Sequence, residues 1–286
     1  MNRDVTGLNW DALVLAGALP RHEARALLEH ASGRPREWLI AHGDEPAPPT
    51  AAALFEALAA RRRAGEPLAY LLGWREFHGL RFTVTPDVLI PRPETELLVD
   101  EAAERAAPGA RVIDLGTGSG AIAVALARLR PDLRITATDR SAAALAVARE
   151  NARRLLTGGA EPRWLCGDWW QAAPPGECFD LIVANPPYIA DGDPHLSLGD
   201  LPHEPRSALA AGADGLHDLR RIVDGARTRL AADGWLLLEH GYDQRDAVQA
   251  LLRDAGWPAP TTLADAAGQP RMTLIRQDPD PRSPSH

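Results

Sequence analysis

The sequence predicts an α/β protein, in which a doubly wound, mostly parallel sheet follows a small helical N-terminal domain. Apolar residues recur at helical spacing through residues 10–65. Further along, short apolar strands alternate with helical patterns, as in parallel sheets covered by helices on both faces. A glycine-rich turn joins the first of these strands to its helix. At 286 residues, the chain is long enough for two domains.

The helical N-terminal domain is predicted to cover residues 1–73. Its apolar residues lie at helix spacing both before and after the segment GDEPAPPT at residues 43–50, which breaks the pattern. Leu27 and Leu28 precede this segment, and Leu54 and Leu58 follow it. Three arginines at residues 61–63 suit the C-terminus of the last helix. A basic contact patch for a partner is the alternative interpretation of these arginines.

A hairpin linker is predicted at residues 74–91, because Phe77, Leu80 and Phe82 flank the turn-forming pair His78-Gly79. The alternating region follows at residues 92–277. Its strands are expected at residues 111–115, 134–139, 162–167, 179–184, 234–241 and 271–276, and its helices begin near residues 94, 120, 141, 215 and 243. The polar, proline-rich tail at residues 278–286 is expected to be disordered.

Composition and charge exclude several classes of protein. The net charge of -8 disfavours an enzyme that grips long nucleic acid, and it favours a protein or small-molecule substrate. The chain contains no lysine, which excludes a P-loop lysine and a pyridoxal Schiff base. Its two cysteines, Cys166 and Cys178, form neither a disulfide framework nor a zinc motif. Without a leader or a long apolar run, we expect a cytoplasmic protein with no membrane partner.

The glycine-rich turn predicts an adenosine cofactor. The turn consists of Gly116, Thr117, Gly118, Ser119 and Gly120, after a strand and before a helix. Glycines there allow a tight turn and a close approach of the backbone to a ligand. Asp139 ends the next strand, where a carboxylate can accept hydrogen bonds from both hydroxyls of a ribose. NAD and S-adenosylmethionine both fit this pattern, and a structural turn with a capping aspartate is the alternative.

Asp168 and Trp169 follow the third strand, where the adenine of such a cofactor is expected. The carboxylate can accept from the adenine amino group, and the indole can line the ring. A turn aspartate and a core tryptophan are the structural alternative.

The segment Asn185-Pro186-Pro187-Tyr188 follows the fourth strand and predicts a site for an NH2 group. Both prolines have a fixed φ, and Pro186 keeps Asn185 extended, so the carbonyl groups here have little freedom. The Asn185 oxygen and the Pro186 carbonyl can each accept one hydrogen of the amide, while Tyr188 packs on the planar group. This arrangement suits methyl transfer to a nitrogen and has no use in a nicotinamide enzyme.

These motifs resemble the class I S-adenosylmethionine-dependent methyltransferases that act on planar NH2 groups, a family with a Rossmann-like fold. Three segments narrow the resemblance: IPRPETE at residues 90–96, the stretch GEPLAYLLGWREFHGLRFTVTPDVL before it, and EPRSALAAGADGL at residues 204–216. They closely resemble the peptide chain release factor glutamine methyltransferases, the HemK/PrmC family. The resemblance extends over nearly the whole chain.

The resemblance implies methylation of the glutamine side-chain amide in the GGQ motif of class 1 peptide chain release factors. Residues 185–188 would hold that glutamine as catalytic and substrate-binding residues, and Asn185 would also contact the cofactor. Residues 116–120, Asp139, Asp168 and Trp169 would bind S-adenosyl-L-methionine. The helical domain would dock the release factor, with no direct contact to nucleic acid.

Three rival functions remain to be tested. A sister family methylates a ribosomal protein through the same NPPY segment, but it usually differs around RPETE. A DNA adenine methyltransferase would need a target-recognition domain and a positive groove. A non-catalytic adenosine-binding scaffold would be expected to lack Asn185 or a loop glycine.

Several polar residues have open roles. The loop at residues 191–203 contains Asp191, Asp193, His195, Asp200 and His203, but their spacing matches no standard metal site, so we expect no metal and a polar loop over the substrate entrance. Glu239 and His240 either reach the pocket or form structural hydrogen bonds. Thr95 and Glu96 either contact the cofactor or only begin a helix.

Overall fold

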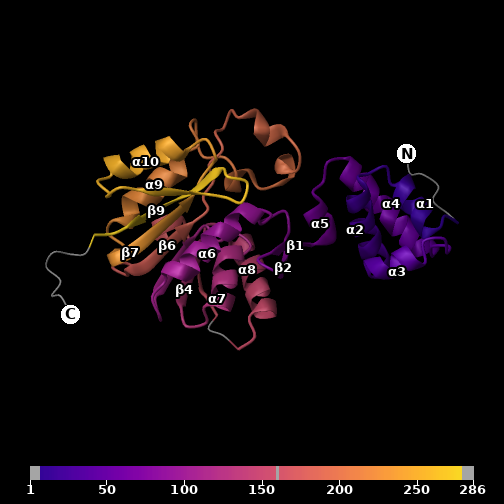
Figure 1. The fold of residues 1–286 in the computed structure, drawn as a ribbon, viewed down its shortest axis with the longest axis horizontal. Coiled ribbons are helices and arrows are strands. Elements are labelled where there is room, and N and C mark those ends of the chain that lie inside the picture. Colours follow the sequence, from indigo (N-terminus) through magenta and orange to yellow (C-terminus); the bar gives the residue numbers. More distant parts are fainter. Residues whose placement is uncertain (1–6, 159–160, 279–286) are drawn as a thin grey trace. The chain divides into compact units, whose positions relative to one another are not determined.

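The structure is a computed structural model that describes residues 7–158 and 161–278 (Figure 1). It divides into two compact units between Trp74 and Arg75. The disordered tail expected at residues 278–286 lies, apart from Asp278, outside the described residues. Within the described ranges, no helix has both the length and the apolar character to cross a membrane.

The first unit is a bundle of short helices. They are α1 (Trp10–Ala16), α2 (Arg21–Ser32), α3 (Arg36–Ala41), α4 (Pro49–Arg63) and α5 (Leu68–Leu72). Leu13, Leu27 and Phe55 are fully buried in its core. A proline at position 20, 35, 48 or 67 immediately precedes each helix after α1. Because proline lacks an N–H and favours the start of a helix, these prolines divide the periodic pattern into more helices than the one predicted break allows.

The hairpin consists of β1 (Trp74–Phe77) and β2 (Leu80–Thr83). Phe77 and Phe82 meet edge to face, with ring centroids 5.9 Å apart, and both are buried in the core of the second unit. The buried Asn151 side chain accepts from the Thr83 N–H at 2.7 Å and donates to the Thr83 carbonyl at 3.0 Å. It also donates to the Ser119 carbonyl at 2.9 Å. One asparagine therefore joins the hairpin to the glycine-rich turn.

The second unit is built on a sheet that has seven strands in the described residues, in the order β5-β4-β3-β6-β7-β9-β8. The strands are β3 (Arg111–Leu115), β4 (Arg134–Asp139), β5 (Arg163–Cys166), β6 (Phe179–Ala184), β7 (Leu230–Glu239), β8 (Thr261–Ala264) and β9 (Pro270–Arg276). Strands β3 to β7 are parallel, and β9 is antiparallel to β7. The predicted fold class is confirmed. The prediction missed β8, a four-residue, partly exposed edge strand that is too short to give a clear alternating pattern.

Helices cover both faces of this sheet (Figure 1). They are α6 (Glu96–Arg105), α7 (Ala121–Leu129), α8 (Ala142–Leu155), α9 (His217–Ala226) and α10 (Arg245–Asp254), with 3-10 turns η1 (Pro93–Thr95), η2 (Trp169–Gln171), η3 (Pro194–Ser197), η4 (Leu201–His203) and η5 (Arg206–Ala208). Val112 of β3 packs in the core with α6 and α7, whereas its neighbour Ile113 packs in the core with α9 and α10. Because successive strand residues point to opposite faces, both faces of β3 must be apolar.

Candidate active site

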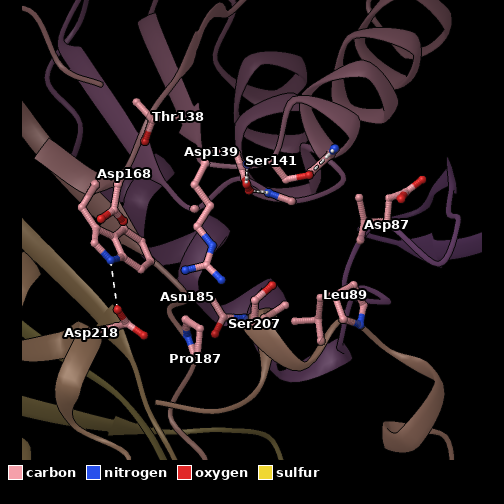
Figure 2. A pocket seen from close by; sticks show the side chains of 18 of the residues that line it. Asp87, Leu89, Thr138, Asp139, Ser141, Asp168, Asn185, Pro187, Ser207 and Asp218 are labelled. Atoms are coloured by element: carbon pink, nitrogen blue, oxygen red, sulfur yellow. Dashed lines mark hydrogen bonds between the residues drawn. The ribbon is translucent and has the colours of Figure 1, made fainter. Parts of the chain in front are cut away.

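A pocket opens beyond the carboxyl ends of β3, β4 and β6 (Figure 2). The strand order reverses between β3 and β6, which is where open α/β sheets bind their ligands. Six of the site residues predicted from the sequence line this pocket together with Asn185: they are Gly116, Gly118, Asp139, Asp168, Trp169 and Pro187. Thr117, Ser119, Gly120 and Pro186 are buried behind its surface, and Tyr188 does not line it.

Backbone groups of the glycine-rich turn form one wall of the pocket. Gly116 and Gly118 have positive φ values of 77° and 56°, which favour glycine. A Cβ added at Gly116 would lie 2.9 Å from the Trp169 ring, whereas one added at Gly118 would meet no atom within 4 Å. Gly116 therefore lets the indole pack closely on the turn, and Gly118 leaves its backbone open to the pocket.

Asp139 is tied to the same turn. Its Oδ2 accepts from the Gly118 N–H at 2.9 Å, and its Oδ1 accepts from the Ser141 N–H at 2.8 Å. Burial raises the pKa of Asp139, while these two N–H groups oppose the shift. Each carboxylate oxygen keeps a free lone pair, so Asp139 can still accept hydrogen bonds from a ligand.

Asp168 and Trp169 have partners on α9. Arg221 donates to both oxygens of Asp168, at 2.5 and 3.3 Å. The Trp169 indole donates to Asp218 at 3.0 Å, the bond drawn to Asp218 in Figure 2. Trp169 also has a positive φ of 47°, which is unusual for a large side chain. The two residues thus form an ordered wall of the pocket, held in place from another helix.

The segment after β6 contributes Asn185 and Pro187 to the pocket. The Asn185 side chain donates from Nδ2 to the Thr95 hydroxyl at 3.0 Å. The Tyr188 carbonyl accepts from the Gln244 side chain at 2.9 Å, so the end of this segment is fixed by the residue that precedes α10. Burial raises the pKa of Tyr188 to about 12, and the charge of Glu239 adds to the shift, so its hydroxyl stays protonated.

Three of the residues whose roles the sequence left open are buried and do not reach the pocket surface. Thr95, Glu239 and His240 are all buried, and none of them lines it. His240 forms hydrogen bonds with the Gly241 carbonyl at 2.8 Å and with Thr273 at 2.9 Å. Glu96 accepts from the His78 N–H at 2.7 Å, which ties α6 to the hairpin.

The opposite wall of the pocket was missed by sequence reasoning. Residues 87–89, from the predicted linker, and Pro205, Ser207 and Ala208 line it. Glu204 joins the two segments, because its buried carboxylate accepts from the Ile90 N–H at 2.9 Å and from the Arg92 guanidinium. The sequence did contain a signal for this contact, because Ile90 and Arg92 belong to IPRPETE and Glu204 begins EPRSALAAGADGL, two of the segments that narrowed the resemblance.

Asp114 is a second residue that sequence reasoning missed. It is buried beneath the glycine-rich turn, where its Oδ2 accepts from the Thr117 hydroxyl at 2.6 Å and its Oδ1 has no hydrogen-bond partner in the described residues. Burial raises the pKa of Asp114 to about 7, although the bond from Thr117 opposes the shift. The proton that the folded chain holds here makes the stability of the protein depend on pH.

We expect Asp114→Asn to reduce the pH dependence of stability. An unfolded aspartate has a pKa of about 3.9, so the wild-type contribution is fully present below about pH 4 and is lost as the pH rises through about 7. Urea unfolding at about pH 5 and about pH 8 measures the effect. Between these two pH values, the fall in the free energy of unfolding should be larger in the wild type than in the variant by about 1 kcal/mol or more. An equal loss in both proteins would contradict the assignment.

No group of three or more His, Cys, Asp or Glu side chains in the described ranges is arranged to hold a metal ion. In the polar loop, Asp193 accepts from the backbone and the ring of His195, at 2.8 and 2.7 Å. Both side chains are largely or partly exposed, so the pair caps the turn η3 at the surface.

Comparisons with known proteins identify the family of each region of the chain and a related fold. The family model for the PrmC N-terminal domain matches residues 8–73, and the model for the methyltransferase small domain matches residues 93–204. The fold resembles that of a methyltransferase from Pyrococcus furiosus, with a TM-score of 0.53 and 18% identity over 76% of this chain and 95% of that one.

Relatives at high sequence identity narrow the family. The release factor glutamine methyltransferase of Bordetella pertussis is 56% identical over 89% of this chain and 94% of its own length. That of Burkholderia pseudomallei is 53% identical over 91% of this chain and 93% of its own length. The chain therefore belongs to the release factor glutamine methyltransferase family.

Proposed function

We propose that this protein transfers a methyl group from S-adenosylmethionine to the side-chain amide nitrogen of the glutamine in the GGQ motif of class 1 release factors. Family membership supports the substrate class, since the relatives are named for release factor glutamine methylation. The observation that carries the proposal is that Asn185 lines the same pocket as Gly116, Gly118 and Asp139.

The pocket suits S-adenosylmethionine, which supplies a methyl group on a sulfonium, an electrophile with a good leaving group. The open backbone at Gly118 accommodates a ligand against the turn, and the free lone pairs of Asp139 can accept from the ribose hydroxyls. Trp169 offers an apolar face for the adenine. Asp168 can accept from the adenine amino group while it stays paired with Arg221, because a carboxylate has about four acceptor positions.

The residues after β6 are suited to orienting a planar amide. In the proposal, the Asn185 Oδ1, which lines the pocket, accepts one hydrogen of the glutamine NH2 group. The Pro186 carbonyl would accept the other and the Tyr188 ring would pack against the amide once the substrate is bound, since neither residue lines the pocket without it. Two acceptors on one nitrogen hold its lone pair in one direction and favour the more tetrahedral form that develops as the methyl group is transferred. The bond between the nitrogen and the methyl group would form as the bond between the methyl group and sulfur breaks. The alkylated nitrogen would then lose one proton to water, so no strong base is needed before attack.

The helical unit has a separate role in the proposal. Residues 1–73 dock the release factor, residues 74–91 connect them to the methyltransferase domain at residues 92–277, and the enzyme works in the cytoplasm, where release factors act. Recognition is of protein by protein, without direct contact to nucleic acid. The match of residues 8–73 to a domain model of this family supports such a division.

A transfer assay tests the proposal. The full-length enzyme and S-adenosylmethionine are incubated with a class 1 release factor, with its GGQ→GGA variant, with the ribosomal protein substrate of the sister family and with duplex DNA. Mass spectrometry of the digested products locates the methyl group. We expect one added methyl on the GGQ peptide and none on the variant.

The other outcomes would each overturn the proposal. Methylation of the ribosomal protein alone would assign the chain the substrate of the sister family. Methylation of DNA would mean that the acidic net charge does not exclude a nucleic-acid substrate. Cofactor binding without transfer to any substrate would indicate an adenosine-binding scaffold.

A further inference from the structure

The side chain of Asn185 can serve as an acceptor in only one of its two amide orientations. Oxygen and nitrogen lie on opposite sides of the planar group, so a rotation by half a turn would present two N–H donors where an acceptor is needed. A glutamine NH2 group offers only donors to such a contact. Something in the protein must therefore distinguish the two ends of the Asn185 amide.

Thr95 is in contact with the nitrogen end. Its hydroxyl accepts from the Asn185 Nδ2 at 3.0 Å, across 90 residues of sequence. Thr95 is only 4% exposed and lies outside the pocket surface, on the turn η1 within IPRPETE. It thus contacts the pocket-lining Asn185 without lining the pocket itself.

A hydroxyl alone cannot distinguish the two ends, because it can donate as well as accept. Glu239 determines whether the Thr95 hydroxyl donates to Asn185 or accepts from it. It ends β7, is 1% exposed, and lies close enough to the Thr95 hydroxyl for hydrogen bonding from that side chain to lower its pKa, whereas its Oε2 has no partner in the described residues. An ionised carboxylate is an acceptor only, so Thr95 must donate its single hydrogen to Glu239. The Thr95 oxygen then accepts, which selects the nitrogen end of Asn185.

We propose that Thr95 and Glu239 are positioning residues, which hold the Asn185 amide with its oxygen available to the substrate glutamine. The inference rests on the proposed function and assigns to two residues a role that the NPPY segment alone does not explain. Neither residue touches the substrate. Each acts through Asn185, by fixing which atom of the amide faces the pocket.

The protonation state of Glu239 governs this chain of hydrogen bonds. Burial raises the pKa of Glu239 to about 7, against the hydrogen bond from Thr95 and the attraction of Arg271. Arg92 also lowers its pKa, and Glu94 raises it, while Tyr188 lies close enough for its own pKa to be raised by Glu239. Once protonated, Glu239 can donate to Thr95, which frees the Thr95 hydrogen to bind the Asn185 oxygen instead.

A matched pair of variants tests the role of Thr95. Thr95→Val keeps the shape of the side chain and removes the hydroxyl, whereas Thr95→Ser keeps the hydroxyl. We expect Thr95→Val to lower kcat for release factor methylation by about tenfold, the effect of one lost hydrogen bond, with the Kd for S-adenosylmethionine changed by less than about twofold. Thr95→Ser should recover most of the loss.

The pH profile tests the role of Glu239. We expect kcat of the wild type to rise as Glu239 ionises near pH 7, and Glu239→Gln to flatten this rise. Asp114, which also titrates near this pH, is unchanged in that variant and serves as an internal control.

Three results would overturn the inference while leaving the proposed function intact. They are a wild-type rate in Thr95→Val, an equal loss in Thr95→Val and Thr95→Ser, and a pH profile of Glu239→Gln identical to that of the wild type. Calorimetry of S-adenosylmethionine binding distinguishes a positioning role from general misfolding. A misfolded pocket would lose cofactor affinity as well as kcat, whereas loss of positioning would lower kcat alone. Failure of the wild type to methylate the release factor would count against the proposed function instead.

Discussion

Asn185→Ala should abolish methyl transfer to the release factor and leave S-adenosylmethionine binding largely intact. The substitution removes the acceptor proposed for the glutamine amide, whereas the glycine-rich turn, Asp139 and Trp169 keep their own hydrogen bonds and contacts. We expect a loss of at least about 100-fold in kcat, the range for removing one group that stabilises a transition state. Steady-state kinetics and calorimetry on the same preparation measure the two effects.

Asn185→Asp is the matched control, since it keeps the size and an acceptor oxygen but cannot donate to Thr95. It should fall between the wild type and Asn185→Ala. Equal losses of transfer and of cofactor affinity in Asn185→Ala would contradict the assignment and place the residue mainly at the cofactor.

Gly215→Ala should lower activity by displacing the Tyr188 end of the segment that begins at Asn185. An added Cβ would lie 2.3 Å from the Tyr188 carbonyl oxygen and 2.8 Å from the Gln244 amide nitrogen, two atoms joined by a hydrogen bond. Gly215 also has a positive φ of 72°, which disfavours alanine. Since Tyr188 ends the rigid segment that begins at Asn185, its displacement should lower kcat by about tenfold or more.

Gly268→Ala separates the two causes. Gly268 has a positive φ of 78°, but an added Cβ there would meet nothing within 4 Å. Both variants should lose stability in urea unfolding, and Gly215→Ala should lose about 1 to 2 kcal/mol more, because only it creates a clash. If the two variants have the same stability and full activity, the Tyr188 segment does not depend on close packing at Gly215.

The fold was predictable from the sequence because its strands are apolar on both faces. Alternation of strand and helix patterns is a strong signal when the central strands of the parallel region bury both sides, as Val112 and Ile113 do in β3. The strand β8 gives no such signal, because it is short and lies at the edge of the sheet. It is held there by antiparallel pairing with β9, which its own sequence does not reveal. In the helical unit, prolines mark helix starts that periodicity alone did not resolve.

The site was predictable where a motif is local and not where it depends on long-range contacts. Gly116, Asp139 and Asn185 stand at strand ends, and parallel strands bring their carboxyl ends to one edge of the sheet. The contact between Glu204 and Ile90 joins residues 114 positions apart, so no spacing rule could reveal it. The link between Thr95 and Asn185 has the same character, with 90 positions between them.

The hydrogen bonds of Asn151 limit where the helical unit could be exchanged for that of another protein. Since this side chain joins Thr83 of the hairpin to Ser119 of the glycine-rich turn, a chimera that replaced the hairpin together with the helices would remove support from the turn. A junction close to the boundary between Trp74 and Arg75 would keep that support. Sequence changes in the helical unit can therefore accumulate before the hairpin without disturbing the glycine-rich turn, whereas changes in the hairpin are constrained by its contacts in the second unit.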